Sequence, residues 1–318
     1  MRAAGNKAGL GLALVSAATF ATSGSFASSL LTAGWSSGAA VTVRVVIAAV
    51  ALTIPALFAL RGHVEQLRRG GRTVAIYGLV AVGGAQLCYF NAIRHLPVAV
   101  ALMLEYSGIL LVVAWMWARH GHRPGRLTAL GGLTAVVGLV LVLDLLGHHR
   151  VDPAGVLWGL GAAVGLGAYY VISSGTDDAL PPLVVAWGGL AVGALALLVA
   201  GALGVLPLAA PLRDVTLAST QVPWIVPVLG MSLVAAAVAY VAGILGARRL
   251  GARVASFVGL TEVLFAVLFA WLLLGQTPGP LQLAGGVLVV AGIALVRLDE
   301  GSEVAAGLSR EQLVATEN

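Results

Sequence analysis

The chain has 318 residues, of which 59% are hydrophobic and only 10% are charged. Soluble domains carry roughly 25% charged residues, so this composition cannot cover a water-facing surface and excludes an ordinary soluble enzyme. The net charge of +5 could attract nucleic acid, but the basic residues lie in short turns between apolar segments, and we predict a lipid bilayer as the partner and no nucleic acid.

Ten apolar segments follow one another, each near the length of about 20 residues that a helix needs to cross the hydrocarbon core. Backbone polar groups must be paired internally in lipid, and the alternation of a β-barrel is absent, so we predict helices. The expected fold is an all-α membrane protein with ten transmembrane helices. The segments are Ala8–Leu31, Ala39–Leu60, Thr73–Ile93, Val98–Ala118, Leu127–Leu146, Pro153–Ser174, Leu183–Leu206, Val222–Ala247, Val254–Leu274 and Pro280–Val296.

The first segment has two readings. Arg2 and Lys7 before an apolar stretch resemble a secretory signal. The stretch is nevertheless long enough to span the bilayer and further spans follow at once, so we interpret it as an uncleaved first transmembrane helix. The lone Cys88 lies inside an apolar segment, excludes an internal disulfide and is interpreted as a small buried hydrophobe.

The basic residues divide unequally between the two sets of turns. Cytoplasmic turns carry an excess of Lys and Arg, so we predict a multi-pass protein of the inner cell membrane with both termini and the polar tail 298–318 in the cytoplasm. Arg94, Arg150 and Arg213 fall outside, and Arg44 falls within a helix. The other 14 fall inside: Arg2, Lys7, Arg61, Arg68, Arg69, Arg72, Arg119, Arg123, Arg126, Arg248, Arg249, Arg253, Arg297 and Arg310.

Two stretches of the chain resemble each other. In Leu104–Trp115 and again in Thr261–Trp271, a single glutamate opens a long apolar run that closes at a tryptophan, and each stretch follows a basic turn. When Arg94 is aligned with Arg248, Glu105 falls within three positions of Glu262. Further on, the glycines of 131–140 match those of 285–294.

These matches divide the chain into two five-helix repeats, residues 1–147 and 153–297. Because five is odd, the second repeat enters the membrane in the opposite orientation. Inverted repeats are typical of transporters, whose substrate site lies near the midplane where the halves meet.

The repeated motifs, together with Arg44 in the segment Val41–Ala49, resemble the EamA family of the drug/metabolite transporter superfamily. The stretch Leu104–Leu110 is most similar to the amino-acid exporter branch that includes threonine/homoserine exporters. The resemblance implies export of small metabolites or amino acids. Two departures stand out: Glu262 is followed by valine where the family often has proline, which puts a helix bend in doubt, and residue 276 is glutamine where the family often has glutamate.

Glu105 and Glu262 are the leading site candidates. At 1.5 Å per residue, Glu105 lies roughly 10 Å below the outer end of its segment and Glu262 roughly 12 Å from the inner end of its own. A charge near the midplane costs about 2.5–3.5 kcal/mol, so such a residue should face the bundle interior or a wet cavity. The functional interpretation is a proton or substrate-amine site. The alternative is a protonated or hydrogen-bonded glutamate that only holds helices together.

Arg44 lies near the outer side and has two interpretations. Its guanidinium could pair with a carboxylate, either that of Glu105 or one on the substrate. Alternatively, the side chain extends to the lipid headgroups.

A third group of candidates combines aromatic and amide side chains. Gln86 and Tyr89 share one face of the third segment with Asn91 close by, while Tyr169 and Tyr240 come from the second half. An aromatic wall with an amide suits a small polar solute. The alternative interpretation is hydrogen bonding between helices and an outer aromatic belt.

Metals and cofactors are not expected. His120, His122 and the pair His148-His149 lie in turns without carboxylate or cysteine partners at ligand spacing. Hydrolase, metalloprotease and phosphate-binding motifs are absent from the sequence. Small-xxx-small patterns such as Gly155-x-x-x-Gly159 indicate tight helix packing, within one chain or across a homodimer.

We therefore predict a membrane exporter of small molecules, with amino acids or related compounds as the expected substrates. It would work by alternating access around a cavity lined by helices 3, 4, 8 and 9, with proton coupling as an option. One alternative is an intramembrane enzyme acting on lipid, which would need a nucleophile–base pair or a metal cluster at membrane depth. The other is a non-transporting scaffold, which would leave the inverted halves and their glutamates unexplained.

Overall fold

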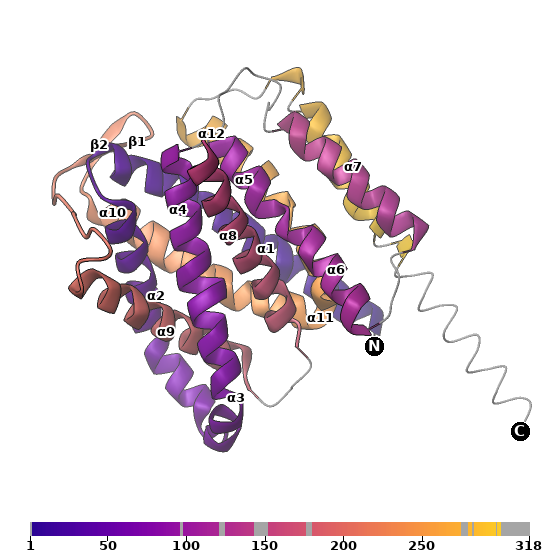
Figure 1. Ribbon diagram of the computed structural model, residues 1–318, viewed down its shortest axis with the longest axis horizontal. Helices are drawn as coiled ribbons and strands as arrows, with labels where there is room; N and C mark the ends of the chain where they lie inside the picture. The colour runs from indigo at the N-terminus through magenta and orange to yellow at the C-terminus, as the bar shows by residue number, and fades with distance from the viewer. Residues whose placement is uncertain are drawn as a thin grey trace, which may run out of the picture.

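The computed structural model describes residues 2–95, 98–120, 125–142, 152–175, 180–274, 279–281, 283–296 and 298–299, and these are mostly helical (Figure 1). Six helices in the described part are long and apolar enough to cross a membrane, so the protein is a multi-pass membrane protein. The histidines at 122, 148 and 149, Gly275-Gln276 and the tail beyond residue 299 lie outside the described residues. The six candidate spans are Lys7–Thr32, Ser37–Leu60, Val64–His95, Pro153–Ser173, Pro182–Ala202 and Ile225–Gly259.

The first half begins with α1 and α2, joined by a tight turn in which Gly34 has a φ of 96°. Its third span is one continuous helix with a π-helical middle, η1. The elements are α1 Arg2–Thr32, α2 Ser37–Leu60, α3 Val64–Ile76, η1 Tyr77–Gly84, α4 Ala85–His95, α5 Val98–Tyr106, α6 Gly108–His120 and α7 Arg126–Val142.

The second half repeats this plan with one addition, a short antiparallel hairpin between α9 and α10. In α11 the backbone turns at Gly251, where φ is 77°, so the predicted basic turn there is present. The elements are α8 Pro153–Ser173, α9 Pro182–Ala202, β1 Val215–Leu217, β2 Thr220–Val222, α10 Ile225–Leu229, η2 Gly230–Val238, α11 Ala239–Gly259, α12 Thr261–Leu274 and the helix Leu283–Val296.

Among the described residues, each predicted segment falls mainly on helix, although not always on a long continuous one. Two segments fall on helices interrupted at Ser107 and Leu260, and two fall on short apolar helices. The number of ten transmembrane helices therefore stays a prediction, while the membrane-spanning, helical character of the chain is established.

Irregular helical features recur at a fixed interval in the two halves. The π-helices η1 and η2 begin at Tyr77 and Gly230, and the interrupted helices break at Ser107 and Leu260. Both pairs are separated by 153 residues. Hence the break near Glu262, which the absence of a proline had put in doubt, is present. Two related backbones therefore share this chain.

The first helix of each half packs mainly against the other half. α1 lies against η2, α11 and α12, whereas α8 lies against η1, α4, α5 and α6. This exchange ties the two repeats together. It also carries α1 into the middle of the molecule, as Figure 1 shows.

α7 and the helix Leu283–Val296 form a pair at one edge of the molecule (Figure 1). Their matched glycines meet in antiparallel order. A Cβ on Gly131 would lie 2.7 Å from the carbonyl oxygen of Gly292, and one on Gly138 would lie 2.7 Å from that of Gly285. Such backbone approach needs glycine on both helices. Asp299 completes the contact, because its Oδ2 accepts hydrogen bonds from the backbone N and hydroxyl of Thr128.

The other glycine patterns also pack within this chain. On α8, Gly159 lies against Leu104 and Gly165 against Ala85, while on α9 Gly189 lies against Tyr77. These faces are therefore occupied by α5, α4 and η1 of the same chain, and the homodimer stays a prediction.

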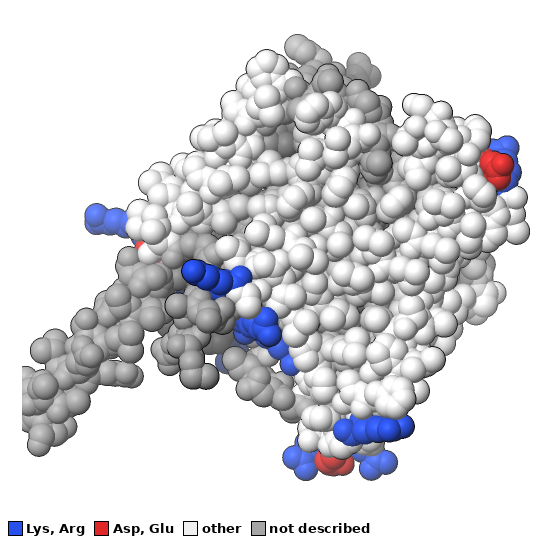
Figure 2. All heavy atoms as spheres, turned by 180° about the vertical axis from the view of Figure 1, so that it is seen from behind, with Lys and Arg blue, Asp and Glu red and all other residues white. Residues whose placement is uncertain are grey.

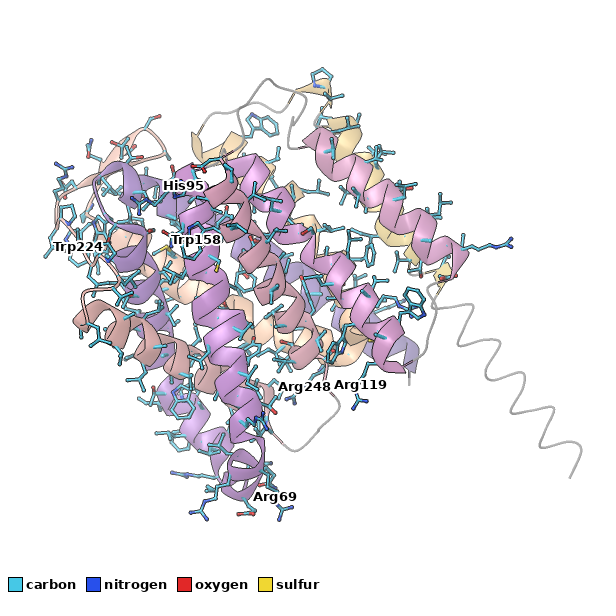
Figure 3. The ribbon with its side chains drawn as sticks, viewed as in Figure 1. Arg69, His95, Arg119, Trp158, Trp224 and Arg248 are labelled. Atoms are coloured by element: carbon cyan, nitrogen blue, oxygen red, sulfur yellow. The ribbon has the colours of Figure 1, made fainter. Side chains whose placement is uncertain are left out.

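Charged residues gather toward the ends of the molecule. Figure 2 shows a broad surface almost free of Lys, Arg, Asp and Glu between them. In Figure 3, Arg69, Arg119 and Arg248 lie toward one end, and His95, Trp158 and Trp224 lie toward the other. This separation agrees with the division of basic turns in the sequence. Below, the ends are called the arginine-rich end and the tryptophan end.

The connection between α9 and α10, residues 203–224, folds back over the α1–α2 turn at the tryptophan end. Ser36 donates from its backbone N to the carbonyl of Ala209 over 2.8 Å and from its hydroxyl to that of Pro207 over 2.7 Å. Arg213 Nη2 donates to the carbonyl of Ala33 over 2.7 Å. These bonds fix the rim of the cavity described next.

Candidate functional site

A cavity of about 710 Å³ enters the molecule from the tryptophan end. At its rim lie Trp35, Arg94 and Pro207. The volume falls within the roughly 300–1,000 Å³ typical of small-molecule sites. Its walls come from α1, α2, α4, α5 and α12, and its deeper part is lined by Phe20, Arg44, Gln86, Tyr89, Glu105 and Glu262.

Both predicted glutamates line this cavity, one on each side of a helix break. Glu105 stands two residues before the break at Ser107, and Glu262 stands two residues after the break at Leu260. The Tyr106 hydroxyl lies within hydrogen-bonding range of the Glu262 carboxylate. Neither carboxylate faces the lipid-exposed surface. The two repeats thus bring one acidic side chain each to a shared hollow.

Arg44 is buried at the cavity, and the structure bears on only part of its two sequence interpretations. Its side chain is 1% exposed, so it does not extend to headgroups, and no carboxylate of the described residues forms an ion pair with it. Nη1 donates to the Ser23 hydroxyl over 2.9 Å and to Gln86 Oε1 over 2.6 Å, and Nη2 donates to the Ala235 carbonyl over 2.5 Å. Both glutamates lie within electrostatic range of the guanidinium. Neutral acceptors take the place that a pair with Glu105 would have had, and a pair with a substrate carboxylate stays a prediction.

The amide and aromatic candidates separate into three groups. Gln86 lines the cavity and accepts from Arg44, and Tyr89 forms part of the wall. Asn91 is not among the residues that line the cavity, and its Nδ2 donates to the carbonyl of Leu87 one turn earlier in α4. Its role in the site stays a prediction.

Tyr169 and Tyr240 lie on the arginine-rich side of the glutamates. They line a smaller cavity of about 60 Å³ that also touches Gln86, Glu105 and Glu262. Around it, rings pack edge to face, with centroids 5.9 Å apart for Tyr169 and Tyr240. Tyr169, Tyr170 and Tyr240, called the tyrosine layer below, separate the large cavity from the arginine-rich end.

Two glycines of α11 make room for the tyrosine layer. A Cβ on Gly243 would lie 1.7 Å from the hydroxyl of Tyr169, and one on Gly259 would lie 1.7 Å from that of Tyr170. The Tyr169 hydroxyl has no hydrogen-bond partner among the described residues, although Ser16 stands beside it. Only glycine lets these hydroxyls rest against the helix backbone.

Sequence reasoning missed the contribution of α1. Its polar face, including Ser23, Ser25 and Ser28, forms one wall of the large cavity. Small hydroxyl residues in an apolar run carry a weak signal, because they occur equally in helix packing. Tyr106 was also missed, although its position next to Glu105 could have drawn attention to it.

At the tryptophan end, Asp152 caps α8. Its Oδ1 accepts from the Ala154 N–H over 2.9 Å, and its Oδ2 lies 2.9 Å from Nδ1 of His95. These two bonds lower the pKa of Asp152 below its ordinary value, with the backbone bond as the larger cause. The contact joins the end of α4 to the start of α8.

The described part of the chain contains no group of three or more His, Cys, Asp or Glu side chains that could hold a metal ion. The cavity lining supplies carboxylates, hydroxyls, an amide, guanidinium groups and aromatic rings. Such a set can bind, orient and exchange protons with a solute.

Comparison with known proteins gives one family and one fold. The model of the EamA-like transporter family matches residues 7–144 and again residues 153–298. A crystal structure of a protein, 21% identical, superposes with a TM-score of 0.72 over 94% of this chain and 99% of its own. At that identity the likeness shows a shared fold. The search of curated proteins returned no match.

Proposed function

The chain belongs to the EamA-like transporter family, and we propose from this that it carries small metabolites, amino acids or related compounds, out of the cytoplasm. Its substrate site would be the large cavity, with Glu105 and Glu262 as the proton- or substrate-binding groups. The single observation that supports the proposal most is that both repeats deliver a glutamate to one cavity at the middle of a membrane-spanning bundle.

Alternating access is the proposed mechanism. The large cavity reaches the tryptophan end, while the tyrosine layer lies between the glutamates and the arginine-rich end. We take this arrangement as the outward-facing state. The inward-facing state would separate the tyrosine layer and close the rim, as expected when two inverted repeats rock around a fixed site.

Interrupted helices support this movement. Helix breaks at membrane depth are tolerated where they line a cavity, and transporters place them at the substrate site. Here the breaks at Ser107 and Leu260 stand beside the two glutamates. The π-helices η1 and η2 add one irregular segment to each repeat, and such segments are frequent at functional sites.

The proposed direction and sidedness rest on the arginine-rich end facing the cytoplasm. Both chain termini would then be cytoplasmic, in an inner cell membrane. Reporter tags inserted in residues 61–63 and 248–251 should both report the cytoplasm. A periplasmic signal from either tag would invert the assignment.

The defining experiment is flux in liposomes. The purified protein would be reconstituted and screened with labelled amino acids and small amines, with pH varied on one side. For any transported solute, Glu105→Gln should abolish the pH dependence of flux because the carboxyl that exchanges a proton is gone. Glu65→Gln, an exposed change on α3, is the matched control.

Two results would count against the proposal. If the pH dependence of flux is unchanged in Glu105→Gln, that residue does not exchange the proton. An absence of flux for every solute, in a protein that retains its helical content, would favour a non-transporting membrane protein.

A further inference from the structure

The large cavity has an unequal supply of accessible charges. Glu105 and Glu262 line its deep part, and Arg44 is the cation beside them. The other cation, Arg94, lies exposed at the rim, where water screens it. Whether a solute carboxylate can be bound at depth therefore depends on how many N–H donors of Arg44 remain unused.

Most hydrogen-bond donors of Arg44 are already used. A guanidinium has five N–H groups, and a carboxylate is bound best by two of them in parallel. Both N–H groups of Nη1 go to Ser23 and Gln86, and one of Nη2 goes to Ala235. Nε has no hydrogen-bond partner among the described residues and is not reached by solvent. The adjacent pair that is left, Nε–H and the second N–H of Nη2, therefore includes a buried atom, so a solute carboxylate meets at most one donor of Arg44.

The glutamates have the opposite character. The described residues provide neither of them with an ion-pair partner, and both face the space that a solute would fill. Aromatic rings stand around them, including Tyr89 and Tyr106. An organic cation is attracted by carboxylates and by the faces of aromatic rings alike.

We infer that this cavity recognises an ammonium group, and that it prefers amines without a carboxylate over zwitterionic amino acids and rejects organic acids. This inference rests on the proposed function and narrows its substrate class. A zwitterion could still place its ammonium at the glutamates, but its carboxylate would be left without a charged partner. An acid would meet two carboxylates at depth, opposed by the charge of Arg44 but without two parallel donors to bind it.

The test uses three labelled compounds with the same ring: tyramine, tyrosine and 3-(4-hydroxyphenyl)propionate. Equilibrium binding to the purified protein should rank them in that order, with tyramine at least about tenfold tighter than the acid, a factor equal to about 1.4 kcal/mol. Flux in liposomes should follow the same order.

Variants locate the preference. Glu105→Gln and Glu262→Gln should each weaken tyramine binding severalfold and narrow the gap to the acid, while Glu65→Gln on the surface of α3 should change neither. The order of affinities of the three compounds is measured on the wild-type protein. A folding defect in a variant therefore does not remove the test.

The inference is overturned if tyrosine or the acid binds as tightly as tyramine, or if none of the three binds. A different result bears on the proposed function alone: tyramine binds with the expected preference, but no compound crosses the membrane. The site would then be a cation site in a protein that does not transport.

Discussion

The two π-helices occupy equivalent places in the repeats but are held by different chemistry. η1 packs against the glycine face of α9, where a Cβ on Gly78 would lie 2.6 Å from the carbonyl oxygen of Gly189. η2 is held by Arg44 of α2, which donates to its Ala235 carbonyl. A Cβ on Gly230 of η2 would lie 2.6 Å from Cζ of Phe26, so close packing occurs in both repeats, and the buried charge is an addition at η2.

This difference explains why the two sides of the glutamates are unlike. Arg44 brings a charge, an amide and a hydroxyl to the side that opens at the tryptophan end. The opposite side carries the tyrosine layer, with Ser16 as a further polar group. Symmetry of the backbone therefore coexists with a polar cavity on one side and an aromatic seal on the other.

Removing the charge from the η2 contact should have the largest effect. Arg44→Met leaves the Ala235 carbonyl and the Gln86 amide without their donor in a buried place, which should lower the free energy of unfolding by about 3 kcal/mol. Denaturant unfolding in detergent measures it. Arg72→Met, an exposed change, should be nearly neutral. If Arg44→Met were as stable as the wild type, η2 would not depend on this charge.

Filling the η1 contact should have the next largest effect. A Cβ on Gly189 would lie 2.4 Å from Cδ1 of Tyr77, so Gly189→Ala overpacks a buried contact and should cost about 1–3 kcal/mol. Gly71→Ala in α3 meets open space and should be neutral or gain up to about 1 kcal/mol from helix propensity. Equal effects of the two changes would mean that η1 is not held by close packing.

The tyrosine layer offers a smaller and more specific test. Gly243→Ala should push against the Tyr169 hydroxyl, whereas Tyr169→Phe removes that hydroxyl. We expect the double variant to be more stable than the sum of the single effects by about 1 kcal/mol, as for residues in contact. Additive effects would place the hydroxyl elsewhere. Thermal unfolding of the four proteins provides the cycle.

The smallest effect is expected at the tryptophan end, outside the spanning helices. Asp152 has a lowered pKa in the folded protein, so its ionised form contributes stability above its ordinary pKa, and this contribution is lost as the pH falls through the lowered value. Asp152→Asn should therefore be slightly less stable than the wild type at neutral pH, with a difference that vanishes in acid. A difference that grows in acid would contradict the role of the carboxylate.

Much of the fold could be predicted from the sequence because a lipid environment leaves few choices. Apolar segments of spanning length had to be helices, and the basic turns had to lie together at one end. The two glutamates stood out for the same reason, since a carboxyl in an apolar run needs a wet or polar neighbour.

What could not be predicted depends on contacts between distant segments. Arg44 was expected to pair with a carboxylate or reach the headgroups, but its acceptors come from α1, α4 and η2. α1 forms a wall of the cavity because it packs against the helices of the other half. No local sequence pattern predicts this packing. The bond from Asn91 to the backbone one turn away could not be predicted either, since the sequence does not show which acceptor an amide will find.

The most direct test of the carrier account is access to the glutamates' surroundings from both sides. In a Cys88→Ala background, Ser28→Cys marks the large cavity and Ser16→Cys marks the small cavity below the glutamates. With a membrane-impermeable thiol reagent in oriented vesicles, we expect Ser28→Cys to react from the tryptophan side and Ser16→Cys to react from the arginine-rich side. A solute that favours one state should speed one reaction and slow the other. Ser16→Cys that never reacts from the arginine-rich side, under any solute, would contradict alternating access.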